Sequence, residues 1–236
     1  VGSEMCIRDR IQAATAPIII GLFYIYIRDK YEKEPWQMLL WGLLFGVYAT
    51  FVIYGVGQWG EAMFPLTDLP FAAAFLQAAL VEESVKLLFL LALLARNPQY
   101  NEPFDAIVYA VFISLGFAWI ENIVYVTHPL WGGIGTALAR AVISIPGHGL
   151  YAVQMGYWLS EAKFAGRKVG WLLAFLVPYL YHGWYNYLLL ADIPAAEIFL
   201  VLLMGLLIIT GLRHMAELLK KSPFRPTGEK LSLIHI

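Results

Sequence analysis

Seven apolar segments separated by short polar connectors make up most of this 236-residue sequence. Each approaches or exceeds the roughly 20 residues that an α-helix needs to cross the hydrocarbon core of a bilayer. The segments are 11–27, 36–57, 70–95, 104–127, 134–159, 169–191 and 195–212. Charged residues are only 14% of the chain, against about 25% in a typical soluble domain. The sequence therefore predicts an all-α, polytopic transmembrane bundle of about seven helices, a multi-pass protein of the cell membrane surrounded by lipid bilayer.

The charge and cysteine content exclude several classes of protein and site. The formal net charge is -1 and the chain has no basic run, so nucleic acid is not an expected partner. Cys6 is the single cysteine, which excludes an internal disulfide and a cysteine-based zinc site. Any metal site must therefore be built from histidine and carboxylate ligands.

The two ends of the sequence differ from its body. Residues 1–10 and 231–236 resemble translated adapter sequence, so they are not expected to belong to the folded domain. The first apolar segment runs into charged residues without a small-residue cleavage site, which argues against a signal peptide. We expect a non-native leader at 1–10, a single integral-membrane domain at 11–215, and a cytoplasmic tail at 216–236 with a non-native end.

Lysine and arginine alternate between the two sides of the predicted bundle. Twelve of the 16 basic residues fall in the connectors after the first, third and fifth segments or in the tail, and none falls in the other three connectors. Basic residues are retained on the cytoplasmic side of a membrane. We therefore expect the N-terminus outside and the C-terminus in the cytoplasm. The alternation also supports seven helices, because one missed helix would destroy it.

Seven ionisable side chains lie inside the apolar segments, away from the segment ends. They are Glu82, Glu83, Lys86, Glu121, Arg140, His148 and His182. A charged group at the centre of a membrane helix costs about 2.5–3.5 kcal/mol even on the mild insertion scale. Such residues are functional-site candidates by default, and we expect them to lie together.

Their spacing places several of these groups on shared helix faces. Glu82 lies four residues and Glu83 three residues before Lys86, so one lysine can contact both carboxylates. His182 and Asn186 share a face of the sixth segment. Counted from the predicted outer ends at about 1.5 Å per residue, the polar groups lie between the midplane and the outer third of the bilayer. One cluster can therefore contain them all.

The fifth segment carries a predicted kink. Pro146-Gly147 immediately precedes His148, and a proline inside a helix removes a backbone hydrogen bond. The freed carbonyl groups are tolerated at membrane depth only beside protein or a water-filled cavity. We therefore expect a water-containing cavity next to His148.

Two imidazoles and up to three carboxylates suit hydrolysis. They can hold a divalent metal ion that keeps one position open for water. They can also act without a metal, with a glutamate as general base and a histidine or asparagine stabilising the oxyanion. The sequence lacks HExxH, GxSxG and GxGD motifs, so HExxH zinc, serine and aspartyl mechanisms are not expected.

Four motifs follow one another in the region 15–215. They are Glu82-Glu83-x-x-Lys86, Phe117-x-x-x-Glu121-Asn122, Arg140 followed by Pro146-Gly147-His148 and Gly156-Tyr157, and His182-x-x-x-Asn186. With these motifs, and with DKYEKEPW at 29–36, the chain resembles the PrsW-type intramembrane proteases, which are related to the CAAX prenyl proteases and bacteriocin-processing membrane proteases. The resemblance implies proteolysis of single-pass or otherwise membrane-anchored proteins, anti-sigma factors among them. Glu121 stands where the CAAX-type relatives carry a histidine, so prenyl-peptide processing is not expected.

The resemblance also implies roles for the residues of the motifs. The expected catalytic residues are Glu82, Glu83, Glu121, His148 and His182. Glu82 or Glu83 is the expected general base, while Glu121, His148 and His182 are expected to hold either a divalent metal ion, with zinc as the first candidate, or the oxyanion. The expected supporting residues are Lys86, Asn122, Arg140 and Asn186.

Other interpretations fit the same residues. Intramembrane Glu, His and Lys also form proton relays, so a small proton-coupled transporter is an alternative, although no inverted repeat is evident. A non-catalytic membrane scaffold is another, although every motif keeps its Glu or His. Arg140 either pairs with Glu121 or the substrate carbonyl, or extends toward the outer interface. Gly42-x-x-x-Gly46 either packs helices or docks a substrate helix.

Overall fold

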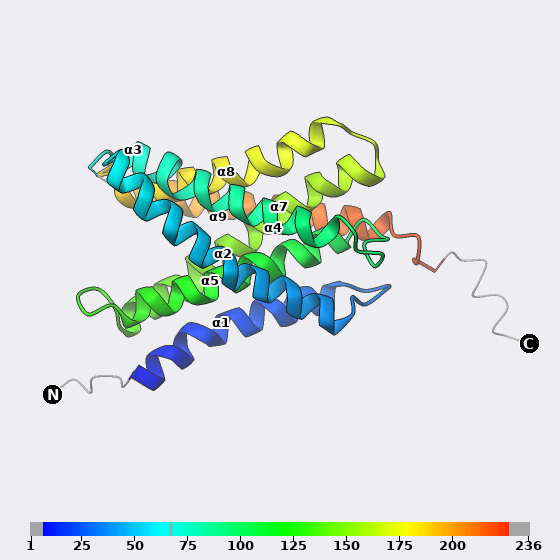
Figure 1. Ribbon diagram of the computed structural model, residues 1–236, viewed down its shortest axis with the longest axis horizontal. Helices are drawn as coiled ribbons and strands as arrows, with labels where there is room; N and C mark the ends of the chain where they lie inside the picture. Colours follow the sequence, from blue (N-terminus) through cyan, green and yellow to red (C-terminus); the bar gives the residue numbers. More distant parts are fainter. Residues whose placement is uncertain (1–6, 67, 227–236) are drawn as a thin grey trace, which may run out of the picture.

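The computed structural model describes residues 7–66 and 68–226, and every regular element within them is a helix. The elements are α1 (Ile7–Arg28), α2 (Trp36–Met63), α3 (Pro70–Ala72), η1 (Ala73–Ala79), α4 (Leu80–Leu94), α5 (Asp105–Thr127), α6 (Ile134–Ala139), η2 (Arg140–Ser144), α7 (Ile145–Phe164), α8 (Val169–Leu190) and α9 (Ala196–Lys220). Figure 1 shows that they run back and forth along one direction.

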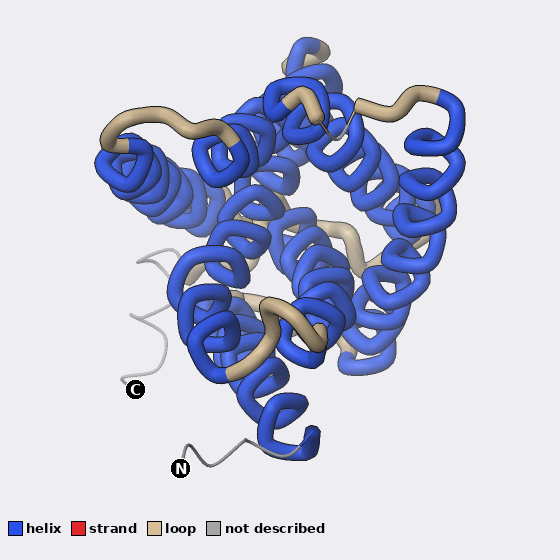
Figure 2. The backbone as a smooth tube through the Cα atoms, turned by 90° about the vertical axis from the view of Figure 1, so that its left-hand side faces the viewer, coloured by secondary structure: helices blue, strands red, loops and turns tan. Residues whose placement is uncertain are grey.

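These elements form seven continuous helical segments in the described part of the chain. The π-helical segments η1 and η2 join α3 to α4 and α6 to α7 without a break. The tube in Figure 2 shows short loops connecting one segment to the next. The predicted all-α bundle and its seven segments are confirmed.

Several helices are longer than their apolar segments. α1 begins at Ile7, inside the segment 1–10 that was not expected in the folded domain, whereas residues 1–6 and 227–236 lie outside the described residues. α9 extends to Lys220, beyond the apolar stretch that ends at 212. Its last turns are amphipathic: Met215 and Leu218 are buried, while Glu217 accepts hydrogen bonds from Tyr157 and Lys221. Packing against other helices thus stabilises the helical turns of α9 that lie beyond the apolar segment.

Within residues 7–66 and 68–226, four helices are long and apolar enough to cross a membrane, namely α1, α2, α5 and α9. The other three segments carry the paired glutamates on α4, His148 on α7 and His182 on α8. The chain is therefore a multi-pass membrane protein. The ionisable side chains that the sequence singles out as site candidates lie on these three less apolar segments, and Glu121 on α5 is the exception.

α5 is the central helix of the bundle and packs against α1, α2, α4 and α7. Its crossing with α2 is so close that a Cβ on Gly46 would overlap the backbone of Ile113 and Phe117, and one on Gly116 would overlap Leu43. Gly42 also lies against α5, beside Phe112. The Gly42-x-x-x-Gly46 motif is therefore used for packing within the protein.

The basic connectors gather at one end of the bundle, on the right in Figure 1. There Lys163 donates to the Tyr100 carbonyl at 2.6 Å, and Lys221 contacts Glu161 at 2.6 Å. The connectors after α2, α5 and α8 lie at the opposite end. This arrangement agrees with the alternation of basic residues, while the side of the membrane on which each end lies stays a prediction.

Candidate active site

The polar groups of the membrane segments come from four packed helical segments. Glu82 and Glu83 lie in the first turn of α4, directly after η1, and His148 lies in the first turn of α7, directly after η2. His182 lies in the middle of α8, and Glu121 is on α5. Except for Glu121, whose side chain is 20% exposed, these residues are buried.

Lys86 connects the two glutamates to His148. Its Nζ lies 3.0 Å from Glu82 Oε2, 3.0 Å from Glu83 Oε1 and 3.3 Å from His148 Nδ1. The same ammonium group lies over the Phe117 ring, 4.1 Å from its centroid. The predicted contact of one lysine with both carboxylates is present, and it is supported by a cation–π contact.

His182 reaches the glutamate pair from the other side. Its Nδ1 lies 2.8 Å from Glu83 Oε1, and its Nε2 lies 3.9 Å from Glu82 Oε2. The rings of His148 and His182 are 5.4 Å apart and nearly perpendicular. Potential ligand atoms of Glu82, Glu83, His148 and His182 all lie within 4.8 Å of one another. We call these four residues the Glu/His cluster.

Glu121 lies at the edge of the Glu/His cluster. Its Oε2 is 3.2 Å from His148 Nε2 and 2.5 Å from an Arg140 nitrogen. Arg140 also donates to Asn122 Oδ1 at 2.8 Å, and Asn122 donates to the Ala14 carbonyl on α1. Arg140 thus pairs with Glu121, as one of the two sequence interpretations expects. The four-residue group that can hold a metal contains Glu82 and Glu83, and Glu121 is outside it.

Asn186 is set apart from the other expected residues. It is half-buried on α8, one helical turn after His182, and it forms no hydrogen bond within residues 7–66 and 68–226. Its expected role in orienting His182 stays a prediction.

Two residues that the sequence interpretation missed also contact the cluster. Ser114 donates through its hydroxyl to the His148 carbonyl at 2.9 Å. Tyr151 stacks on His182, with ring centroids 5.0 Å apart, and also contacts His148. The spacing of His148 and Tyr151, three residues apart on one helix, is the only sequence signal for the tyrosine.

The donor set fits a divalent metal ion. Two imidazoles and two carboxylates are ordinary zinc ligands, and Glu83 Oε2 is buried without a hydrogen-bond partner in the described structure. The three glutamates of the site face two permanent cations, Lys86 and Arg140. A bound cation or a protonated imidazole would neutralise the remaining negative charge, which is costly in an apolar medium.

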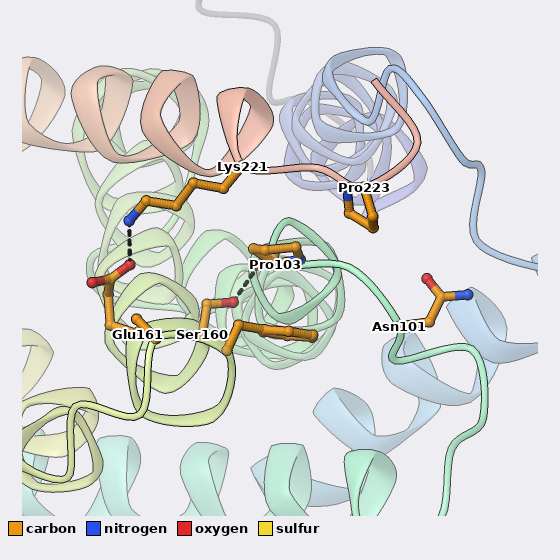
Figure 3. Close-up of a pocket in the computed structure, with 8 residues that line it drawn as sticks. Asn101, Pro103, Ser160, Glu161, Lys221 and Pro223 are labelled. Carbon is orange, nitrogen blue, oxygen red and sulfur yellow. Dashed lines mark hydrogen bonds and ion pairs between the residues drawn. The ribbon is translucent and has the colours of Figure 1, made fainter. Parts of the chain in front are cut away.

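Three cavities of about 370–450 Å³ in the described residues are lined by residues outside the Glu/His cluster. One lies at the charged end of the bundle, where Figure 3 shows Lys221 bonded to Glu161 and Ser160 bonded to Pro103. Glu161 follows His148 by 13 residues on α7, which is about 20 Å along a helix. This pocket is separate from the Glu/His cluster, and the water-containing cavity expected beside His148 stays a prediction.

Comparison with known proteins identifies the family. Residues 34–212 match the PrsW family intramembrane metalloprotease. The chain is 42% identical over 183 residues to Protease PrsW of Geobacillus kaustophilus, an alignment that covers 77% of this chain and 80% of that protein. It is 35% identical to the Clostridioides difficile protein over 82% of this chain and 84% of that protein, and 36% identical to the Bacillus subtilis protein over 77% and 83%. No solved structure matches the chain. The chain therefore belongs to the PrsW family of intramembrane proteases.

Proposed function

We propose that this protein cleaves peptide bonds of membrane-anchored proteins, including proteins of the anti-sigma-factor type, with a water molecule activated by the Glu/His cluster. The observation that carries the proposal is the meeting of four buried ligand or base groups, from three helical segments, within 4.8 Å. Buried ionisable groups inside a membrane are retained where they do chemistry. Together with membership of a protease family, this favours peptide hydrolysis over transport or a scaffold role.

We assign the general base to Glu82. Its side chain is 10% exposed, whereas that of Glu83 is 1% exposed, so water reaches Glu82 more easily. Glu82 accepts the proton of the attacking water and returns it to the leaving amine. Lys86, 3.0 Å away, holds the carboxylate in place during both steps.

Glu83, His148 and His182 would hold a divalent metal ion, because three protein ligands leave one position open for water. When bound, the ion would polarise the scissile carbonyl group and make the water more acidic. Glu121 orients His148 through its contact with Nε2, and Arg140 in turn fixes the Glu121 carboxylate. The same residues without a metal still provide a base and hydrogen-bond donors for the oxyanion.

The direct test compares new protein N-termini in membranes of cells that express the wild type, Glu82→Gln, Glu83→Gln or His148→Ala at matched levels. We expect new termini, near the outer ends of transmembrane segments, with the wild type alone. Glu197→Gln is the matched control, since it makes the same chemical change at an exposed position. Identical lists for the wild type and all three site variants would refute proteolysis by this cluster. Proton or solute flux in liposomes would then test the transporter alternative.

A second experiment separates the metal-dependent from the metal-free mechanism. Metal content is measured by mass spectrometry on the purified wild type and on the His148→Ala/His182→Ala variant. A metal-dependent enzyme carries close to one equivalent of a divalent metal in the wild type, loses it in the variant, and stops cleaving when a chelator removes it. Cleavage by a metal-free wild type would contradict the ligand assignment and leave Glu82 as a base acting alone.

A further inference from the structure

Tyr151 has a buried phenol group beside both histidines of the Glu/His cluster. Its side chain is 1% exposed, and it lies three residues after His148 on α7. The phenol ring stacks on His182 at an interplanar angle of 15°, and it meets His148 edge-on at 6.0 Å. The ring therefore forms one wall of the site.

The hydroxyl group of Tyr151 has no hydrogen-bond partner among residues 7–66 and 68–226. This is unusual, because a buried hydroxyl without a partner lowers stability. Among the other buried tyrosines, Tyr157 donates to Glu217 and Tyr109 donates to Glu34, while Tyr100, at the charged end of the bundle, is also unpaired within the described residues. A buried donor that is left unpaired beside a reactive cluster is explained most simply by an acceptor that arrives with the substrate.

Gly147 keeps space free next to this hydroxyl. A Cβ built at Gly147 would lie 3.3 Å from Tyr151 Oη, closer than most real Cβ contacts. Any larger residue before His148 would therefore crowd the hydroxyl. The glycine in Pro146-Gly147-His148 thus keeps a side chain from packing against the hydroxyl.

We propose that the Tyr151 hydroxyl donates a hydrogen bond to the oxyanion of the tetrahedral intermediate. This inference rests on the proposed function. Water adds to the scissile carbonyl carbon as its proton passes to Glu82, and the carbonyl π electron pair moves onto the oxygen. Tyr151 stabilises that oxygen and keeps its own proton. When the C–N bond breaks, the electron pair returns to re-form the carbonyl, and Glu82 delivers its proton to the leaving amine.

The test is Tyr151→Phe, which keeps the ring stacked on His182 and removes the hydroxyl alone. The substrate is a synthetic transmembrane peptide from a protein identified by its new N-terminus, cleaved by the full chain in detergent. Removing one donor to an oxyanion costs about 10²–10³-fold in kcat, so we expect a fall of that size with KM unchanged. The melting temperature should stay the same or rise, because no hydrogen bond is lost.

Tyr157→Phe is the matched control on the same helix. It removes a hydroxyl that is bonded to Glu217 at the charged end, so it should lower the melting temperature and leave kcat unchanged. This opposite pattern separates the loss of a catalytic donor from a general effect of a Tyr→Phe change in α7.

Three outcomes would overturn the assignment. If Tyr151→Phe is as active as the wild type while Glu82→Gln is inactive, the Tyr151 proposal fails and the proposed function stands. If both variants keep full activity, both proposals fail. If Tyr151→Phe raises KM, or loses activity only in proportion to a lower melting temperature, the residue binds substrate or supports the fold and does not stabilise the oxyanion.

Discussion

Each permanent charge in the buried site contacts an opposite charge. Lys86 bonds to Glu82 and Glu83 one turn earlier on its own helix, and Arg140 bonds to Glu121 from a different segment. Desolvating a charge costs several kcal/mol, and a partner recovers that cost only while both members are present. Removing one member of a pair should therefore be worse than removing both.

The Arg140–Glu121 pair allows this idea to be tested. Arg140→Met should lower the free energy of unfolding by about 3–5 kcal/mol, because it removes the permanent cation from a mostly buried carboxylate and leaves it only the His148 contact. Adding Glu121→Gln should recover part of that loss, with a coupling energy of about 1–3 kcal/mol. The measurement is denaturant unfolding of the two single variants and the double variant in detergent. Strictly additive effects would show that the pair contributes no net interaction.

Asp29, in the connector after α1, is the clearest titrating group outside the membrane segments. Burial raises the pKa of its carboxyl group from 3.8 to about 7, although the Glu34 backbone N–H donates to it. Burial also raises the pKa of Glu34 in the same connector and of Glu102 in the connector between α4 and α5. The folded protein therefore binds these protons more tightly than the unfolded chain does.

The sign of the pH dependence follows from this difference. The stabilisation is fully present below pH 3.8, the unfolded value, and is lost as the pH rises through about 7. We expect the melting temperature of the wild type to fall as the pH rises from about 4 to about 7, the interval between the unfolded and folded pKa of Asp29. In Asp29→Asn this fall in melting temperature should be smaller, because Asp29 no longer titrates. It should not disappear, because Glu34 and Glu102 still do. Parallel melting curves for the two proteins would contradict the assignment to Asp29.

At the scale of elements, both π-helical segments lie directly before site residues. η1 ends at Ala79, three residues before Glu82, and η2 ends at Ser144, four residues before His148. π-helical turns occur frequently at functional sites. The sequence predicts a kink at Pro146, where the structure has a wide π turn just before the proline. The stretch 73–79 contains no proline or glycine, so nothing local predicts η1.

The crossing of α2 and α5 sets the position of the helix that carries Glu121. Gly46→Ala should separate the two helices, because the new Cβ would overlap the backbone of Ile113. We expect a loss of about 1–3 kcal/mol in the free energy of unfolding. Gly55→Ala is the control on the same helix, with no atom within 4 Å, and it should be neutral or slightly stabilising. Equal stability of the two variants would mean that the close crossing is not required.

At the scale of the whole molecule, the seven helical segments of the described residues place successive connectors at alternate ends of the bundle, and the connectors that carry basic residues lie at one of these ends. Retention of basic residues in the cytoplasm then predicts which end faces the cell interior. This orientation also predicts that the Glu/His cluster, whose glutamates lie 12 and 13 residues after Pro70 in one continuous helical segment, is between the midplane and the outer third of the membrane.

This orientation can be measured by labelling single cysteines in intact cells, in a Cys6→Ser background. Leu130, after α5, and Ala165, after α7, are both exposed. A membrane-impermeant maleimide should label Leu130→Cys directly and Ala165→Cys only after the cells are opened. The reverse pattern would place the basic end outside and contradict the predicted topology.

The sequence alone predicted the seven helical segments, their approximate ends, and most of the polar residues that the structure brings together. These are local properties: the length of an apolar run and the cost of a charge in lipid depend on the residues of one segment. The contact of Lys86 with Glu82 and Glu83 was predictable for the same reason, since helical spacing determines it.

The tertiary structure decided which of these groups meet. In the folded protein Glu82 and Glu83 lie beside His148 and His182, and Glu121 lies at the edge of this cluster, paired with Arg140. Tyr151 contacts the cluster, whereas Asn186 forms no hydrogen bond within the described residues. Such contacts depend on the rotation and depth of each helix, which are determined by the close α2–α5 crossing and by the π segments before the site. Residues far apart in the sequence determine these packing variables, so the spacing within one segment does not contain them.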